Sequence, residues 1–220
     1  MIHLMKITYF ALYFCLLASP VFSQDSYRGE VVTEKLKTSD FRPLQPNQCR
    51  IILLRHGETD WNVAGKAQGW TDVPLNEHGR LEAKELSNKF ADVDIKHVYT
   101  SSLSRAVETA EIIAAPHKAI VIADPILRFY KNQKNWTSFF KTRKMKKAEM
   151  RKEISVDSLL YLKDLVRKHP GETVLIVTHG RVVKSIFVSL GNHSYQEVAI
   201  QNGGMATVLG DPNSISLETL

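Results

Sequence analysis

Two uninterrupted apolar runs stand out in the chain, and each is followed, after one polar residue, by a histidine and a glycine. They lie within residues 50–54, which lead into Arg55-His56-Gly57, and within residues 173–178, which lead into His179-Gly180. Short apolar runs without alternation are typical of strands buried on both faces, as in the middle of a parallel sheet. Ligands in open α/β sheets bind at the carboxyl ends of the strands, so we expect a site where these two runs end.

Four other segments carry apolar residues at helical spacing and are predicted to be helices. Asn76 can cap the first helix, and Ser101 or Ser102 can cap the second. The third covers residues 154–168 and ends before Pro170-Gly171, and the fourth covers residues 180–190. The residues expected to face the core are Leu81, Leu86 and Phe90 in the first helix, Leu103, Ala106, Ala110 and Ile113 in the second, and Leu159, Leu162 and Val166 in the third.

Shorter strands are predicted at residues 97–100 and 119–123, with two edge strands at 206–209 and 214–217. Alternating strands and helices indicate an α/β three-layer sandwich with a mainly parallel central sheet. A chain of 220 residues, 44% hydrophobic and 24% charged, suits one globular domain with one sizeable core. Cys49 adjoins the first strand and is expected to be a small buried hydrophobe.

The first 48 residues lie outside this pattern. Lys6 is followed by an apolar run at residues 7–18, then by Ser19-Pro20 and small residues before Gln24. This order is typical of a secretory signal peptide over residues 1–23, and an uncleaved anchor is the alternative. Residues 24–48 form a polar leader, and residues 49–220 form the single domain. We therefore expect a periplasmic or secreted protein, without an intramolecular disulfide because one cysteine remains.

A basic and aromatic segment interrupts the domain at residues 128–153. It holds ten basic and two acidic residues, a net charge of +8, where the whole chain carries +6. Trp136, Phe139 and Phe140 have the spacing of one helix face. The segment either binds an anionic membrane surface or an envelope glycan, or it forms only a solvated helix face. A nucleic-acid partner is not expected.

The residues at the predicted strand ends suit a phosphate group. Arg55 offers a rigid fork of donors, and the largely neutral ring of His56 can act as a nucleophile. Gly57 lets the backbone turn and approach a ligand. Arg105 lies early in the second helix, and Gly180 opens a helix whose amides and dipole favour an anion.

No metal or cofactor is expected. The remaining histidines are expected in loops or at the surface, without metal-ligand spacing: His78, His97, His117, His169 and His193.

Four segments, in this order, resemble the signature motifs of the histidine phosphatase superfamily, the phosphoglycerate-mutase-like proteins. They are RHGETDWN at 55–62, GWTDVPLNEHG at 69–79, SSLSRAVETA at 101–110 and VTHG at 177–180. The resemblance spans roughly residues 50–209. It implies a phosphoglycerate-mutase-like fold and a metal-independent phosphatase that forms a phosphohistidine intermediate.

The resemblance also assigns roles to residues. His56 would attack phosphorus, and Arg55, Arg105 and His179 would bind the phosphoryl oxygens and stabilise charge in the transition state. Glu58 and Glu108 would be structural, as orienting or capping partners for the arginines. The residues expected to bind substrate beside these four are Gly57, Asn62, Gln68, Gly69 and Gly180.

One departure from the family pattern concerns the general acid. Phosphatases and mutases of this family usually carry a glutamate after a Leu-Arg pair, shortly before a tryptophan. Here Leu127-Arg128 is followed by Phe129 and Tyr130, with Trp136 downstream. The missing carboxyl group disfavours a mutase and a general alkyl phosphatase, because general acid help contributes about 10²–10⁴-fold to the rate. The nearest carboxyl groups in sequence are those of Asp124, Glu149 and Glu153.

Three functions follow from these observations. The leading hypothesis is an exported, metal-independent phosphatase that hydrolyses phosphate esters or anhydrides of an anionic substrate. A non-catalytic protein that keeps the pocket and binds a phosphate ligand or the envelope is the second; the missing acid supports it and the intact His56 opposes it. A phosphoglycerate mutase is the third, and both the export signal and the missing acid disfavour it.

Overall fold

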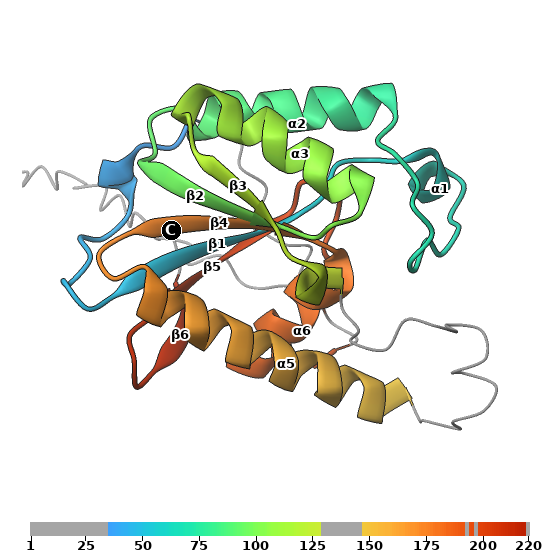
Figure 1. Ribbon diagram of the computed structural model, residues 1–220. Coiled ribbons are helices and arrows are strands. Elements are labelled where there is room, and N and C mark those ends of the chain that lie inside the picture. Colours follow the sequence, from blue (N-terminus) through green and yellow to red (C-terminus); the bar gives the residue numbers. More distant parts are fainter. Residues whose placement is uncertain (1–34, 129–146, 192–193, 196–197, 219–220) are drawn as a thin grey trace, which may run out of the picture.

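The computed structural model describes residues 35–128, 147–191, 194–195 and 198–218 (Figure 1). The predicted signal peptide, the start of the polar leader and residues 129–146 of the basic segment lie outside this part of the chain. A central sheet separates two layers of helices, with α2 and α3 on one face and α5 and α6 on the other (Figure 1). The predicted three-layer α/β sandwich is thus confirmed.

The sheet has six strands in the order β3-β2-β4-β1-β5-β6. Strands β1 to β4 run parallel, whereas β5 is antiparallel to β1 and β6 is antiparallel to β5. The prediction of two edge strands at the C-terminus is therefore wrong for β5, which is paired on both sides and wholly buried. The strands are β1 Cys49–Arg55, β2 Ile95–Thr100, β3 Ile120–Ala123, β4 Thr173–Thr178, β5 Met205–Gly210 and β6 Ile215–Glu218.

Five α-helices and three short 3-10 helices accompany the strands in the described part of the chain. None of these helices is long and apolar enough to cross a membrane. The α-helices are α1 Asp60–Val63, α2 Glu77–Phe90, α3 Ser104–Ala114, α5 Lys147–Lys168 and α6 Gly180–Leu190. The 3-10 helices are η1 Thr38–Asp40, η2 Ala115–His117 and η3 Pro125–Arg128.

Helix α2 begins as predicted but turns a different face inward. The Asn76 side chain accepts a hydrogen bond from the Gly79 amide at 2.8 Å, which confirms the cap. Leu86 and Phe90 are buried, but Leu81 is 59% exposed. Positions five residues apart lie about 140° apart around a helix, so Leu81 and Leu86 cannot share a face. Ala83 occupies the inward position instead.

Helix α3 is capped from a distance rather than by its own serines. It starts at Ser104, whose amide donates to the Asp72 carboxylate at 2.7 Å. The N-cap position is Leu103, and the Ser101 hydroxyl contacts His179 and the Leu103 amide instead of an amide of the helix, so the predicted Ser101 or Ser102 cap is wrong. The predicted inward face of this helix, from Leu103 to Ile113, is buried as expected.

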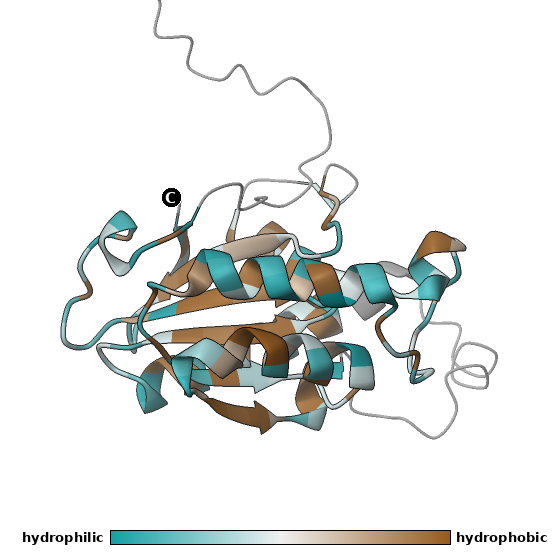
Figure 2. Ribbon diagram, turned by 90° about the horizontal axis from the view of Figure 1, so that it is seen from above, coloured by the Kyte–Doolittle hydropathy of each residue, from teal (hydrophilic) through white to brown (hydrophobic). Residues whose placement is uncertain are grey.

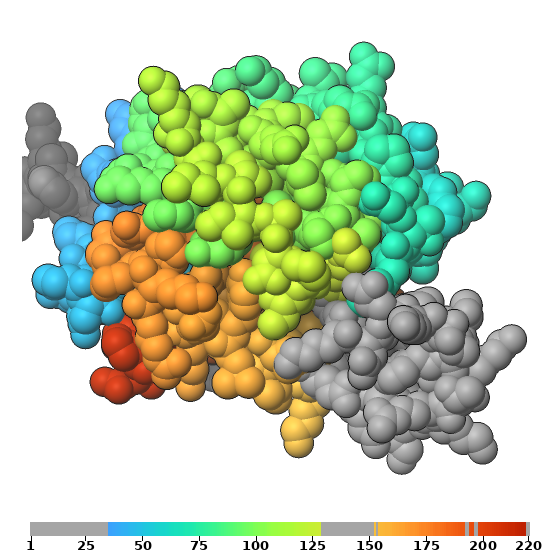
Figure 3. Space-filling view, viewed as in Figure 1, coloured from blue at the N-terminus to red at the C-terminus, as the bar shows by residue number. Residues whose placement is uncertain are grey.

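Helices α5 and α6 cover the opposite face. Helix α5 begins at Lys147, seven residues before the predicted start at Ile154, and α6 matches its predicted bounds. Leu162 and Val166 are buried, whereas Leu159 is only half-buried. In the space-filling view, the side chains of α3 (yellow-green) and of α5 (orange) lie on opposite sides of the sheet (Figure 3).

The core consists of two apolar layers that share strand β1. Ile51 and Leu53 pack toward α5 and α6, and Ile52 and Leu54 pack toward α2 and α3. Figure 2 shows the apolar residues concentrated on the strands, while the helices carry both polar and apolar positions. Cys49 is fully buried in the first layer, as predicted, and burial raises the pKa of its thiol to about 12.

Candidate active site

The carboxyl ends of three parallel strands meet at one cavity. Strand β1 ends at Arg55, β4 is followed by His179, and β2 is followed by Ser101. The His56 amide donates to the Thr178 carbonyl at 3.0 Å, which holds the ends of β1 and β4 together. The cavity measures about 400 Å³, and the four predicted catalytic residues Arg55, His56, Arg105 and His179 all line it. The structure thus brings them together, and their roles in the reaction stay predictions.

His56 is held in a single tautomer by its neighbours. Its Nδ1 lies 2.7 Å from the Gly57 carbonyl oxygen, which can only accept, so Nδ1 carries the proton. Its Nε2 accepts a hydrogen bond from Nε of Arg105 at 3.2 Å. Both contacts assign the lone pair to Nε2, on the side of the ring that faces Arg105 and the cavity.

The surroundings of His56 keep the ring neutral. Burial lowers the pKa of His56 well below 6.5, and the positive charges of Arg55 and Arg105 lower it further. The hydrogen bond to the Gly57 carbonyl acts in the opposite direction but does not offset these effects. An imidazole that stays unprotonated at neutral pH keeps its Nε2 lone pair available for nucleophilic attack.

Arg105 is a fully buried cation fixed by several acceptors. Its Nη1 donates to the Thr71 carbonyl and its Nη2 to the Gly69 carbonyl, both at 3.0 Å. Its Nη2 also lies 3.5 Å from Nδ1 of His179. Burial lowers the pKa of Arg105 to about 10, so the guanidinium remains charged at neutral pH. The side chain is a fixed positive charge between the two histidines.

His179 stands beside His56 at the cavity. The two ring centroids are 5.3 Å apart and the ring planes are inclined by 67°. Nε2 of His179 lies 2.8 Å from the Ser101 hydroxyl. Burial lowers the pKa of His179 well below 6.5, and His56 and Arg105 lower it further. The sequence predicts only a capping role for Ser101, although its place in the third motif is a signal for the site.

Arg55 and Gly180 fit against each other at the start of α6. Nη1 of Arg55 donates to the Ile200 carbonyl at 2.7 Å. A Cβ atom on Gly180 would lie only 3.2 Å from Cδ of Arg55, so a larger residue would push the arginine away. Both line the cavity, as do Asn62, Gln68 and Gly69. The first turn of α6 therefore faces the same space as the arginines, which favours an anion there.

Gly57 is not among the residues that line the cavity, and its predicted contact with substrate stays a prediction. A Cβ atom at Gly57 would lie 2.5 Å from the Gly79 carbonyl oxygen, and one at Gly79 would lie 2.1 Å from the Glu58 carbonyl oxygen. The two glycines allow the loop after β1 to pack directly on the start of α2. Close backbone approach, rather than a ligand, explains why Gly57 lacks a side chain.

The cavity wall contains three cations that our sequence analysis did not identify, Lys66, Arg181 and Lys184. With Arg55 and Arg105 they make five positive side chains, and no carboxylate of the described residues lines the wall. Arg181 and Lys184 follow Gly180 within the first turns of α6, and this position was the available signal. The wall is therefore suited to a multiply charged anion.

Asn202 is a further residue that the sequence did not reveal. Its side-chain amide donates to Oδ1 of Asn62 at 3.2 Å and to the His56 carbonyl at 3.4 Å. Oδ1 of Asn62 also accepts from the Thr59 hydroxyl at 2.9 Å. These bonds tie the loop after β1 to the segment before β5, and so they fix the rim of the cavity.

The two acidic residues predicted to orient the arginines do so only in part. Glu108 pairs with Arg80, with Nε and Oε1 2.5 Å apart, outside the cavity. Glu58 accepts from the Asn76 side chain at 2.9 Å and lies near His78, so it supports the start of α2 and not an arginine.

The region of the missing acid is described only up to Arg128. Nη2 of Arg128 donates to the Ser102 carbonyl at 3.3 Å, and its guanidinium lies over the Trp70 ring. Asp124 accepts from the Ile126 amide and does not line the cavity. The predictions on Phe129 and Tyr130, and on the side chains of Glu149 and Glu153, fall outside the described residues.

Comparison with known proteins identifies the family. The sequence pattern of the histidine phosphatase superfamily (branch 1) matches residues 51–129 and 128–220. Phosphoglycerate mutase-like protein 4 of Arabidopsis thaliana is 33% identical over 173 residues, which are 69% of this chain and 75% of that protein. The uncharacterized phosphatase PhoE of Bacillus subtilis is 31% identical over 167 residues, 72% of this chain and 86% of that protein.

Other matches are local or structural. A probable phosphoglycerate mutase GpmB of Proteus mirabilis is 43% identical, but only over 79 residues, 37% of its length. The solved structure of Bacillus stearothermophilus YhfR superposes with a TM-score of 0.65 at 28% identity, covering 78% of this chain and 96% of that one. With its histidine and arginine cavity and these matches, the chain belongs to the histidine phosphatase superfamily and is an enzyme of the phosphatase or mutase type.

Proposed function

We propose that this protein is an exported phosphatase that hydrolyses phosphate esters or anhydrides without a catalytic metal, through a phosphohistidine at His56. One observation carries the proposal: the neutral ring of His56 presents Nε2 to a cavity lined by five cations and no described carboxylate. Such a wall attracts a phosphate dianion and leaves the nucleophile unprotonated.

In the first step, the Nε2 lone pair of His56 attacks phosphorus while the bond to the leaving oxygen breaks. The three remaining phosphoryl oxygens are expected to face Arg55, Arg105 and His179, and the positive charges of the two arginines stabilise the transition state. A positive charge develops on the imidazole as the P–N bond forms. The Gly57 carbonyl, 2.7 Å from Nδ1, accepts the Nδ1–H bond and stabilises that charge.

In the second step, water attacks the phosphohistidine. The P–N bond breaks, the electron pair returns to Nε2, and the proton lost by water leaves with phosphate or solvent. The enzyme is thereby restored with His56 neutral. Fixed guanidinium groups supply the positive charge that a divalent ion provides in metal-dependent phosphatases. We therefore expect turnover to survive treatment with a chelator at a temperature where the protein stays folded.

The absence of a carboxylate from the described cavity wall favours good leaving groups. Aryl phosphates, phosphoanhydrides and acyl phosphates leave as stable anions, whereas an alkyl alkoxide needs a proton. We expect kcat/KM to fall steeply as the pKa of the leaving group rises. A flat dependence would reveal an acid at the site, and Ala substitutions at Asp124, Glu149 and Glu153 would then locate it.

The substrate itself is proposed to carry a second anionic group. Lys66, Arg181 and Lys184 add three cations to the wall beyond the two arginines near His56. The basic segment 128–153 carries a net charge of +8 in sequence and is proposed to recruit an anionic surface or glycan. Replacing Lys144, Lys146 and Lys147 with Ser should weaken binding to anionic vesicles at low salt, where charges are least screened.

The central experiment is acid-quenched labelling with an aryl phosphate that carries radioactive phosphorus. We expect an acid-labile phosphoenzyme in the wild type and none in His56→Ala. His78→Ala is the matched control, because His78 is an exposed histidine outside the cavity wall. Undiminished label in His56→Ala would refute the nucleophile. Phosphate binding without label or turnover on any substrate would favour the second candidate, a non-catalytic binding protein that lacks the acid.

Export is tested separately. Cell fractionation should place the protein outside the cytoplasm, and mass spectrometry of its N-terminus should find Gln24. A cytoplasmic protein that keeps its first residues would refute this part of the proposal without affecting the chemistry.

A further inference from the structure

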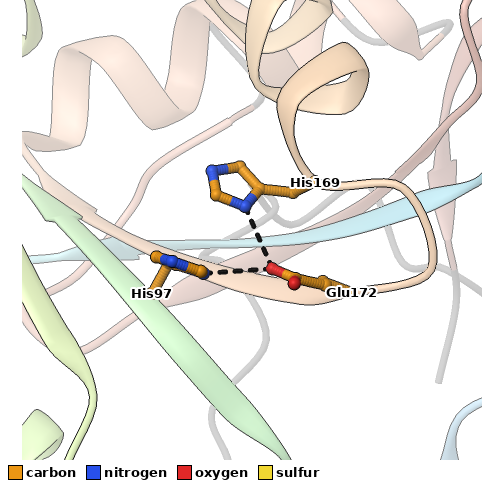
Figure 4. A group of neighbouring side chains, drawn as sticks. All are labelled: His97, His169 and Glu172. Carbon is orange, nitrogen blue, oxygen red and sulfur yellow. Dashed lines mark hydrogen bonds and ion pairs between the residues drawn. The ribbon is translucent and has the colours of Figure 1, made fainter.

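A second cluster of histidines lies at the other end of the sheet. His97, His169 and Glu172 point toward one another from strand β2, the end of α5 and the turn before β4 (Figure 4). One carboxylate oxygen of Glu172 lies 3.0 Å from Nδ1 of His97 and 3.0 Å from Nδ1 of His169. The expectation of loop or surface residues is therefore wrong for both, because His97 lies in a strand and His169 is buried.

The backbone brings these three residues together across the sequence. His97 lies opposite Val174 in the β2–β4 ladder, so its side chain stands beside the first residues of β4. A tight turn places His169 and Glu172 on one side, because Gly171 adopts a φ of 77° and the Glu172 amide donates to the His169 carbonyl. The Gly171 amide also donates to the Gln48 carbonyl, which anchors the turn to the start of β1.

His169 is oriented by a second contact on its far side. Its ring is buried, and its Nε2 lies 2.8 Å from the hydroxyl of Tyr99. Histidines that bind metals through one nitrogen usually have the other nitrogen held in this way. The side chains of His97 and Glu172 are 23% and 30% exposed, so an ion and a water molecule have access from that side.

Among the described residues, the two imidazoles are the groups within ion-pair distance of the Glu172 carboxylate. No lysine or arginine of that part of the chain pairs with it. One oxygen of this carboxylate already faces both imidazoles at 3.0 Å, so it is placed to act as a ligand together with them.

We propose that His97, His169 and Glu172 bind a divalent first-row transition metal ion, for which Zn²⁺ is the probe. Two imidazole nitrogens and one carboxylate oxygen are suitable ligands for such ions. Ligand atoms about 2.0–2.1 Å from a tetrahedral zinc ion lie about 3.3 Å apart, close to the present separation from Glu172 of 3.0 Å. Water completes the coordination on the exposed side.

This site is separate from the proposed reaction. It lies at the amino-terminal ends of the parallel strands, whereas His56 and His179 follow their carboxyl-terminal ends. An ion there would tie β2, α5 and β4 together and act on the stability of the fold. The proposal therefore stands or falls independently of the phosphatase chemistry.

The test is a calorimetric titration of the full chain with Zn²⁺ after chelator treatment, combined with thermal unfolding. We expect one site in the wild type and a Tm about 5–10 °C higher at a Zn²⁺ concentration of about 100 Kd. Glu172→Gln and His97→Gln should lose this site. Tyr99→Phe should weaken it by about 10–100-fold, because it removes only the hydroxyl that orients His169.

The control is His117→Gln, which removes a partly buried histidine outside the cluster and should leave binding unchanged. Circular dichroism establishes that each variant is folded before titration. Zn²⁺ binding that survives in both Glu172→Gln and His97→Gln but disappears in His56→Ala would assign the ion to the catalytic cavity and overturn the proposal. Absence of binding by the wild type would show that the cluster is only a hydrogen-bonded link.

Discussion

Replacement of Arg105 by lysine separates the charge of this residue from its geometry. All three nitrogens of the guanidinium make contacts. Nε donates to Nε2 of His56, and Nη1 donates to the Thr71 carbonyl. Nη2 donates to the Gly69 carbonyl and lies near Nδ1 of His179. A lysine keeps the positive charge but has one nitrogen, which cannot occupy all of these positions. Loss of one preorganised donor typically costs about 10²–10³ in rate, and we expect a loss of this size in kcat/KM.

The same substitution should lower stability by a calculable amount. At least one of the two carbonyls that now accept from Arg105, on Thr71 and Gly69, loses a charge-assisted hydrogen bond. Such a bond contributes about 1.5–3 kcal/mol, which corresponds to a fall in Tm of about 3–12 °C for a domain of this size. The loss in kcat/KM and the fall in Tm have the same cause, the loss of hydrogen bonds made by Arg105, so we expect both in the same variant.

The assay is kcat/KM for an aryl phosphate, measured beside thermal unfolding. Arg80→Lys is the matched control, because Arg80 forms an ion pair with Glu108 at the surface and lies outside the cavity. Its rate should be unchanged and its stability altered by less than about 1 kcal/mol. An Arg105→Lys enzyme within about threefold of wild type would refute the geometric reasoning and show that charge alone suffices.

Three further predictions concern other groups. His56 and His179 both have a pKa held below 6.5, chiefly by burial, so the unfolded chain binds more protons. The free energy of unfolding should therefore fall as the pH drops below about 6.5, and urea titrations showing constant stability from pH 7.5 to 5.5 would contradict this. Ser101→Ala removes the hydroxyl that contacts Nε2 of His179 and should lower kcat/KM about tenfold, with KM nearly unchanged. A change in KM alone would indicate that Ser101 contacts the substrate. Glu218→Ala removes the carboxylate that lies 2.6 Å from Nε of the buried Arg50. The free energy of unfolding, measured in urea, should fall by about 3–5 kcal/mol. A fall below about 1 kcal/mol would mean that water replaces the carboxylate.

The elements that could be predicted from sequence are those whose signal is local. Strand β4 and helix α6 have their predicted bounds, because an apolar run and a Gly at each helix end are properties of neighbouring residues. The meeting of Arg55, His56 and His179 was also predictable, since strand ends mark the site in a parallel sheet, whereas the role of Arg105, on helix α3, is implied by the family resemblance. Position along the chain was enough for these features.

The features that escaped prediction depend on residues far apart in the chain. Asp72 caps α3 from 32 residues away, which no local capping rule can detect. His97 and Glu172 are 75 residues apart and meet only because β2 and β4 are neighbours in the sheet. Strand β5 likewise lies inside the sheet because it pairs in antiparallel fashion with β1. The sequence of a short apolar strand does not indicate which strand it pairs with.

The contact between Gly57 and Gly79 has a consequence for how this gene can vary. Every amino acid that one base change can substitute for glycine carries at least a Cβ atom, and at either position that atom would meet backbone within 2.5 Å. A second substitution cannot relieve either clash, because the atoms met are backbone atoms and the facing residue is already a glycine or contributes only its backbone. In a saturation mutagenesis library selected for activity, we expect these two codons to be as invariant as those of the catalytic histidines, although neither glycine lines the cavity.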